Sequence, residues 1–210
     1  MIQGLPSLTV ERLSNYRRVL NSYQYLDEAY IFSHHLARHV KIKAATVRRD
    51  LMLIDITGDQ HRGYKVSEVL NKIAEAIDPD DITNICFAGM GHLGSTIMDY
   101  LNSYHSRLKV IARFSLDETA DHSAEPPSYS LTEIQQVIRS KNIKICALAV
   151  APDFARELTT ILMTAGITGI LNFSPVQLQS SKTLNIENFD IVSKLERMAY
   201  ETNPNHKKED

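Results

Sequence analysis

The chain reads Gly89-Met90-Gly91-His92-Leu93-Gly94 directly after a short apolar run, 83–88, and directly before a segment, 95–104, with apolar residues at helical spacing. A strand, a glycine-rich turn and a helix in this order form the turn that binds the pyrophosphate of a dinucleotide. The first glycine permits the tight turn, the second lets the backbone approach the phosphates, and the third lets the helix pack closely on the strand. We therefore expect the six residues of this motif to contact a dinucleotide.

The composition is that of a globular protein. The chain has 210 residues, 43% hydrophobic and 23% charged, which suits one large or two small domains. No apolar run reaches the roughly 18–20 residues of a membrane span, and the start does not resemble a signal peptide, so we expect a cytoplasmic protein without a membrane partner. Cys86 and Cys146 lie in apolar, strand-like runs and are expected to be reduced core thiols. We expect no metal site.

The segment before the motif has a helical pattern instead of a Rossmann pattern. Helices are predicted at 9–23, 32–39 and 43–54, followed by a small hairpin at 56–66 and a linking helix at 66–77. In the third helix, Val47, Leu51 and Ile54 share one face at i, i+4 and i+7, so Arg48 and Arg49 point away from it. A helix, a short turn, a basic helix and a hairpin are typical of a winged helix-turn-helix that binds DNA.

The stretch 38–49 contains lysines and arginines but no aspartate or glutamate. A basic cluster is often only a solvated face, but its place on a predicted helix-turn-helix favours contact with DNA phosphates or bases. Either Arg48 or Arg49 could instead pair with Asp50 or Glu11. The predicted DNA-binding residues, in a helix-turn-helix region from Tyr16 to Ile54 with the hairpin beyond it, are Lys41, Lys43, Thr46, Arg48, Arg49, His61 and Arg62.

From residue 82 onward the pattern alternates between strands and helices. Strands are predicted at 82–88, 108–114, 143–150 and 169–172, and helices at 94–104, 131–141, 152–165 and 190–200. This alternation predicts an α/β fold, a parallel sheet with helices on both faces. Ligands of such sheets bind at the carboxyl ends of strands, which adds Val150, Ala151 and Pro152 to the candidate nucleotide site. The predicted domains are 1–78, 79–188, a C-terminal helix at 189–201 and a flexible tail at 202–210.

Six stretches of the chain carry a family resemblance. They are 12–18, 47–51, 58–64, the glycine motif 89–94, 166–176 and 188–190. On these motifs the chain resembles the Rex family of bacterial redox-sensing transcriptional repressors, which respond to the NADH/NAD⁺ balance. In the glycine motif the family usually has Asn in place of His92.

The resemblance implies a homodimer whose winged helices bind a palindromic DNA operator. NADH, the regulatory ligand together with NAD⁺, is implied to close the dimer and release the DNA. The C-terminal helix is implied to be swapped between subunits, although the same apolar stripe could pack on its own subunit. Tyr100 and Asp190 match a Tyr and an Asp that link the nicotinamide site, the partner and the N-terminal domain of the family. The resemblance implies a regulator that is not an enzyme.

Two departures from the family pattern leave alternatives open. Ser115 stands where the family has an acidic residue that binds the adenine ribose, with Arg113 two residues before and Asp117 two residues after it. This predicts either ordinary NAD(H) binding despite the exchange, or weakened or altered nucleotide sensing, with tolerance of NADP(H) open. Asp59 and Gln60 occupy wing positions that are basic in the family, so operator affinity could differ. A small NAD(P)-dependent oxidoreductase is the remaining alternative, and the operator sequence is not predicted.

Overall fold

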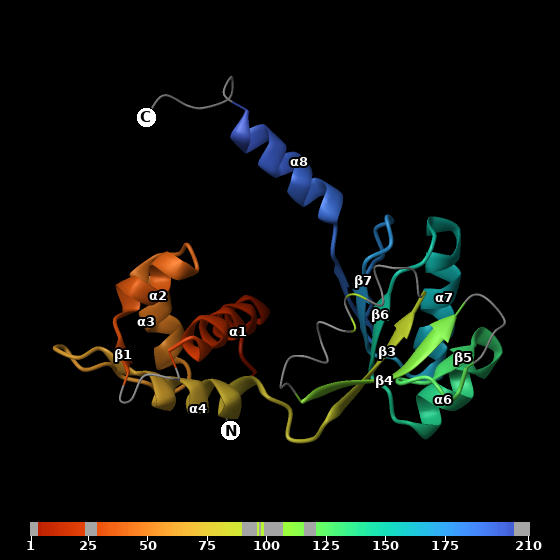
Figure 1. Cartoon of the computed structure of the whole chain (residues 1–210), viewed down its shortest axis with the longest axis horizontal. Helices are drawn as coiled ribbons and strands as arrows, with labels where there is room; N and C mark the ends of the chain where they lie inside the picture. Colours follow the sequence, from red (N-terminus) through yellow and green to blue (C-terminus); the bar gives the residue numbers. More distant parts are fainter. Residues whose placement is uncertain are drawn as a thin grey trace. The chain divides into compact units, whose positions relative to one another are not determined.

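The structure is a computed structural model that describes residues 4–23, 29–89, 96, 98, 107–115 and 121–203. The chain divides into two compact units, residues 1–80 and 81–210 (Figure 1). The division falls in the Pro79–Asp81 segment, where the helical pattern of the sequence changes to strand–helix alternation.

The first unit is a small helical domain with a two-stranded sheet. Its elements are α1 (Ser7–Asn21), β1 (Tyr30–Ile31), α2 (Ser33–His39), α3 (Ala44–Met52), β2 (Tyr64–Lys65) and α4 (Val66–Ile77). A single core joins them: Leu13, Tyr16 and Leu20 of α1 pack with Leu51 of α3 and Ile73 of α4. These residues recur at helical spacing, so burial of one apolar face accounts for each helix.

The predicted hairpin at 56–66 needs correction. Only the tip of this segment pairs with itself, through one antiparallel bridge between Asp59 and Gly63. The next residues, Tyr64 and Lys65, pair instead with Ile31 and Tyr30 of β1. The wing is therefore built from two distant parts of the chain. This pairing could not be predicted from the sequence, because a two-residue strand such as β1 has no alternating pattern to detect.

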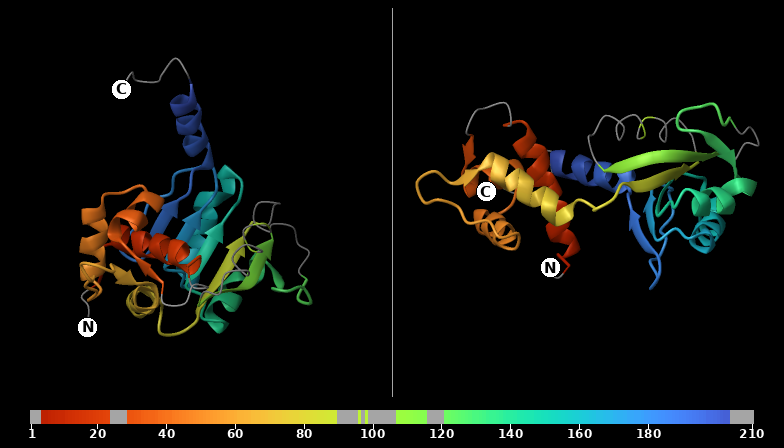
Figure 2. Two further views of the ribbon diagram at one scale, coloured as in Figure 1. Left: turned by 60° about the vertical axis from the view of Figure 1, so that its left-hand side comes forward. Right: turned by 90° about the horizontal axis from the view of Figure 1, so that it is seen from below.

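The second unit contains a six-stranded parallel sheet. Its strands are β3 (Thr83–Ala88), β4 (Leu108–Ser115), β5 (Ser128–Ser130), β6 (Ile145–Leu148), β7 (Gly169–Asn172) and β8 (Asn185–Asn188), arranged in the order β5-β4-β3-β6-β7-β8 (Figure 2). Counted within this unit the order is 3-2-1-4-5-6, which is the Rossmann order. The predicted α/β fold with a parallel sheet is confirmed, and the two edge strands β5 and β8 are additions to it.

The sheet is covered on both faces. On one face, α6 (Ile134–Ser140) and α7 (Pro152–Ala165) join Cys86, Phe114 and Leu148 in the larger core. On the other face, Phe87 and Ala147 form a second cluster with Met98. Met98 and Thr96 are the described residues of the helix predicted at 94–104, and both are helical. A short 3₁₀ turn, η1 (Leu131–Glu133), precedes α6 with a capping box formed by Ser130 and Glu133.

The last helix, α8 (Ile191–Thr202), buries no residue. Its side chains are exposed throughout, including the apolar residues Ile191, Val192, Leu195 and Met198. Among the described residues, no helix is long and apolar enough to cross a membrane.

Candidate DNA-binding and nucleotide-binding sites

The side chains of α3 differ in burial and charge between the two sides of the helix. Val47 and Leu51 are fully buried, whereas Arg48 and Arg49 are exposed, as predicted from the spacing. Asp50 is buried with only 1% of its surface exposed. Neither arginine pairs with Asp50, because that carboxylate is held by residues of α1. Both arginines therefore lie on the exposed side of α3.

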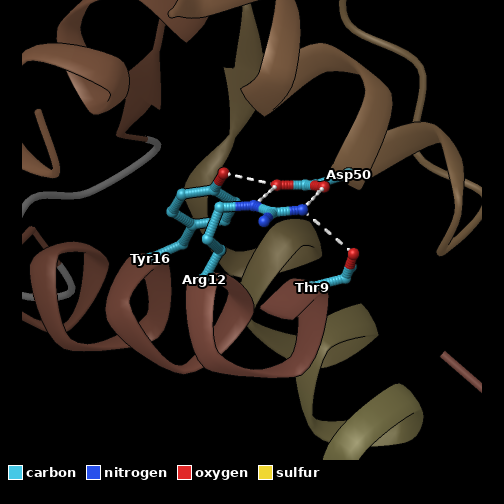
Figure 3. Close-up of polar contacts among 4 residues, drawn as sticks. All are labelled: Thr9, Arg12, Tyr16 and Asp50. Carbon is cyan, nitrogen blue, oxygen red and sulfur yellow. Dashed lines mark hydrogen bonds and ion pairs between the residues drawn. The ribbon is translucent and has the colours of Figure 1, made fainter. Parts of the chain in front are cut away.

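A buried polar network holds α3 against α1 (Figure 3). The Arg12 guanidinium donates to Asp50 through Nε at 2.6 Å and Nη2 at 2.7 Å, and Tyr16 Oη donates to Asp50 Oδ2 at 2.7 Å. Arg12 Nη2 also donates to Thr9 Oγ1 at 3.0 Å. Burial and the bond to Asp50 raise the pKa of Tyr16 well above its usual range, and the bond to Asp50 raises the pKa of Arg12. The bidentate contact with Arg12 and the hydrogen bond from Tyr16 offset the free-energy cost of burying the Asp50 carboxylate.

The other predicted DNA-binding residues of the helix-turn-helix lie around the same helix. Arg48 Nη1 donates to Ser33 Oγ at 3.2 Å, which ties its side chain to the start of α2. Lys41 lies in the turn between the two helices with φ +55°, and Lys43 is the residue before α3. Arg49 and Thr46 line a groove of about 440 Å³ together with Arg12 and Leu8. These cations lie in the turn and on the exposed side of α3, where a nucleic-acid backbone could contact them.

The wing tip places His61 and Arg62 on an exposed turn. Both side chains are exposed, and the Arg62 guanidinium lies 6.0 Å from the centre of the Tyr30 ring. Asp59 Oδ1 accepts the backbone N–H groups of both residues at 2.7 Å. From the sequence, Asp59 stands out only as an acidic residue at a wing position that is basic in the family, and the structure adds this local role.

The carboxyl ends of three strands meet at Gly89. This residue follows β3 with φ +86°, and its N–H donates to Phe114 O of β4 at 3.1 Å. A Cβ at this position would lie 2.2 Å from Ala149 O and 2.6 Å from Val150 Cγ1, so only glycine fits against the end of β6. The point between β3 and β6 is where the strand order of the sheet reverses, which is the usual ligand position of this fold. Met90, Gly91, His92, Leu93 and Gly94 lie outside the described residues.

The end of β6 supplies the next wall of the candidate nucleotide site. Val150 is buried and its N–H donates to Ser174 Oγ at 3.0 Å, while Ala151 caps α7 and Pro152 begins it. Both Ala151 and Pro152 are exposed at this edge. The structure therefore brings Gly89 and these three predicted residues together at one edge of the sheet.

Ser115 ends β4 at the same edge. Ala112 and Phe114 enter the larger core, so the alternation of the strand turns Arg113 and Ser115 toward the opposite face. Arg113 Nε is buried without a hydrogen-bond partner in the described part of the chain. The pKa of Asp121 is lowered, first by its bonds from Ser123 and further by the charge of Arg113. Arg113 thus shares a face with Ser115. Asp117 and Tyr100 lie outside the described residues.

A buried asparagine network at the ends of β7 and β8 was not among the predicted site residues. Asn172 Nδ2 donates to Asn188 Oδ1 at 2.8 Å and to Val176 O at 2.7 Å, while Asn172 Oδ1 accepts from Ser174 N. Because Ser174 holds Val150, this network supports the end of β6. Asn172, the last residue of the predicted apolar strand 169–172, was the available signal, since asparagine is unfavourable within strands. The strand that contains Asn188 is polar and was not predicted.

Asp190 begins α8 beside a cavity of about 480 Å³. Its carboxylate accepts hydrogen bonds from the N–H and the hydroxyl of Ser193. Both bonds lower the pKa of Asp190, and the bond from the hydroxyl has the larger effect. Phe173, Phe189 and Val192 supply apolar walls of the cavity. The predicted role of Asp190 toward a partner subunit concerns contacts beyond this chain. Among the described residues, no three His, Cys, Asp or Glu side chains are placed to hold a metal ion.

Comparison with known proteins covers nearly the whole chain. Residues 4–51 match the family described as "Putative DNA-binding protein N-terminus", and residues 80–176 match the "CoA binding domain" family. The redox-sensing transcriptional repressor Rex of Leuconostoc citreum is 31% identical over 198 residues, 93% of this chain and 92% of that protein. Rex of Levilactobacillus brevis is 28% identical over 200 residues, 94% of each chain. These relatives are named as repressors.

Solved structures show the same fold. RSP in complex with beta-NAD+ and operator DNA superimposes with a TM-score of 0.82 at 25% identity and covers 94% of this chain and 93% of that one. RSP in complex with beta-NADH gives a TM-score of 0.79 at 24% identity. With a DNA-binding unit, a Rossmann-ordered sheet and sequence identity along both, the chain belongs to the Rex family of redox-sensing transcriptional repressors.

Proposed function

We propose that this chain is a homodimeric, cytoplasmic repressor that binds a palindromic DNA operator and releases it when NADH replaces NAD⁺. The observation that carries the proposal is the arrangement of α3, in which Asp50 is locked inward by Arg12 and Tyr16 while Arg48 and Arg49 face outward. A rigid helix with outward cations is what DNA recognition requires. The family membership and the relatives bound to operator DNA, NAD⁺ and NADH support the same assignment.

The nucleotide site is proposed at the edge where β3, β4 and β6 end. Gly89, Val150, Ala151 and Pro152 lie together there, and Ser115 ends the neighbouring strand. We assign the pyrophosphate to the glycine turn and the adenine ribose to the end of β4, following the general placement in Rossmann sheets. The oxidation state of the bound dinucleotide would set the affinity for DNA, so the protein need not catalyse a reaction.

The homodimer is proposed to form through α8. This helix exposes an apolar stripe and has no buried residue of its own, which leaves its apolar face for another copy of the chain. Exchange of α8 between subunits would then cover Ile191 and Leu195. Asp190 would lie at this interface.

Selection from a randomised duplex library with the full-length protein and NAD⁺ provides the DNA for the test. The duplex that is enriched then serves as the probe in fluorescence anisotropy titrations, with NAD⁺, NADH, NADPH or coenzyme A added. We expect NADH to release the probe and NAD⁺ to leave it bound. The proposal is wrong if no duplex is enriched or if no nicotinamide dinucleotide changes the affinity.

The recognition helix is tested with the same probe. Arg48→Ala and Arg49→Ala are each expected to weaken binding by about 1–3 kcal/mol, because each removes a cation that faces the DNA. Arg156→Ala, an exposed arginine on α7 of the second unit, serves as the control for a lost charge. Wild-type affinity in both α3 variants would contradict the assignment of this helix.

The alternative of altered nucleotide sensing rests on Ser115 and Arg113. A serine accepts fewer hydrogen bonds than a carboxylate, and Arg113 brings a cation to the same face of β4. Titration calorimetry with NADH, NAD⁺ and NADPH separates the two candidates. Equal affinity for NADPH and NADH would favour the altered ligand range.

A further inference from the structure

The wing tip, residues 59–63, is a turn held by hydrogen bonds between backbone groups and by hydrogen bonds to the Asp59 carboxylate. Asp59 N–H donates to Gly63 O at 2.7 Å, and Gly63 N–H donates to Asp59 O at 2.9 Å. Between these bonds, Asp59 Oδ1 accepts the N–H groups of His61 and Arg62, each at 2.7 Å. The side chain of Asp59 therefore satisfies two backbone donors that a five-residue turn would otherwise leave to water.

The base of the wing fixes where this turn stands. Gly63 has φ +82°, and a Cβ on it would lie 2.5 Å from Ile31 O, so the chain passes closely over β1. Arg62 packs its guanidinium over the ring of Tyr30 in β1. Backbone contacts on both sides and a ring contact therefore define the position of Arg62.

Asp59 also brings a negative charge to the wing. The N–H of Arg62, and then that of His61, lower the pKa of Asp59, so its carboxylate is ionised at neutral pH. Toward DNA phosphates this charge is repulsive. Asp59 therefore has two opposite effects on DNA binding, a structural one that favours it and an electrostatic one that opposes it.

We propose that Asp59 is a positioning residue for DNA binding, which folds the wing tip so that Arg62 meets the phosphate backbone, and that this effect exceeds the repulsion by its own carboxylate. The inference rests on the proposed DNA-binding function. Repulsion of an exposed charge is screened over roughly 8 Å at physiological salt. A cation held in place loses less conformational freedom when it contacts a phosphate, so its contact is stronger.

The sign of the effect distinguishes the two contributions. Asp59→Ala removes both the turn contacts and the charge, and we expect it to weaken binding of the enriched duplex about threefold or more. Asp59→Asn keeps an oxygen that accepts the same two bonds and removes the charge, so we expect equal or tighter binding. Glu68→Ala, which removes an exposed acidic side chain on α4 of the same unit outside the wing, is the matched control and should bind like the wild type.

Dependence on Arg62 separates positioning from a general loss of structure. Arg62→Ala is expected to weaken binding and to lower the salt dependence by about 0.9 in log–log slope, as one phosphate contact is lost. In the Arg62→Ala background, Asp59→Ala should cause no further loss. Circular dichroism and the melting temperature of each variant confirm that the domain is folded.

Three results would overturn the inference. They are an Asp59→Ala variant that binds as tightly as the wild type, an equal loss from Asp59→Ala with or without Arg62, and an Asp59→Asn variant as weak as Asp59→Ala. Failure of the proposed function is recognised separately, because Arg48→Ala and Arg49→Ala would then also bind the duplex like the wild type.

Discussion

Asp50 shows how a single residue converts a basic helix into an oriented one. The sequence places Arg48, Arg49 and Asp50 in succession, and only one of the three can face the core. The structure buries the carboxylate, because Arg12 and Tyr16, one turn apart on α1, both reach it. This pairing spans 38 residues for Arg12 and could not be read from local spacing. The exposed position of both arginines could be predicted from local spacing, because it follows from the apolar face formed by Val47, Leu51 and Ile54.

The pKa of Tyr16 leads to a prediction about alkaline stability. Burial, and then the bond to Asp50, raise this pKa above the unfolded value of about 10, so the neutral phenol stabilises the fold below pH about 10 and this contribution is lost as pH rises above it. Tyr16→Phe should reduce the free energy of unfolding at pH 7 by about 1 kcal/mol. It should also lessen the decline above pH about 10.

Urea unfolding followed by far-UV circular dichroism at several pH values measures both effects. The difference between variant and wild type matters, because buried Tyr64 also has a raised pKa and contributes to the alkaline decline of both proteins. Tyr30→Phe, at an exposed tyrosine outside α8, serves as the control. An identical pH profile in Tyr16→Phe and the wild type would contradict the role assigned to this phenol.

Ser115 gives the second prediction at this scale. Ser115→Asp should strengthen NADH binding by about 1 kcal/mol or more, because a carboxylate can accept both ribose hydroxyls. It should also disfavour NADPH, whose 2′-phosphate would meet a like charge. Calorimetry with both ligands measures the change. An unaltered ratio of the two affinities would show that the end of β4 does not contact the adenine ribose.

At the scale of elements, two glycines in the left-handed region test how closely β3 and β6 meet. Gly89→Ala places a methyl group 2.2 Å from Ala149 O, and Gly166→Ala, at φ +113°, meets nothing within 4 Å. We expect Gly166→Ala to cost about 1 kcal/mol of backbone strain, and Gly89→Ala to cost about 2–4 kcal/mol and to weaken cofactor binding. Thermal unfolding and calorimetry measure the pair. Equal costs would mean that this junction can relax.

The longer helices and the apolar strands could be predicted from sequence, and the strands β1, β5 and β8 could not. The helices α1, α3, α4 and α7 have apolar faces that repeat over two turns or more, so their pattern is local. By contrast, β1 has two residues and exists only because β2 pairs with it. The strand β8 reads Asn-Ile-Glu-Asn, a polar run stabilised by pairing with β7 at the edge of the sheet.

At the scale of the whole molecule, each unit carries one of the two candidate sites. The residues of one site lie close together in sequence, and those of the other lie far apart. The proposed DNA-binding residues are a prediction from charge within the helix-turn-helix and the wing, which are local features of the sequence. The nucleotide site depends on strand ends that lie far apart in sequence, namely Gly89, Ser115 and Val150. Only the resemblance to a family identified Ser115 as a position of interest. The hydrogen bond between Asn172 and Asn188 joins two strands and could not be predicted from the sequence.

The exposed stripe of α8 carries the prediction for the assembly. Ile191, Val192, Leu195 and Met198 are 40%, 62%, 59% and 55% exposed, and an exposed apolar stripe of this kind is typical of an interaction surface. Leu195→Glu combined with Met198→Glu should convert the dimer to a monomer in sedimentation experiments, because two charges would be buried between copies. Glu196→Gln on the same helix should remain dimeric.

Loss of the dimer should also weaken DNA binding. A palindromic duplex binds two recognition helices at once, and the second contact benefits from a high effective concentration once the first has formed. The monomeric variant should therefore bind the enriched duplex at least about tenfold more weakly, while its affinity for a duplex with one half-site changes little. A double variant that stays dimeric, or a monomer that binds the palindrome like the wild type, would place the subunit interface elsewhere than on α8.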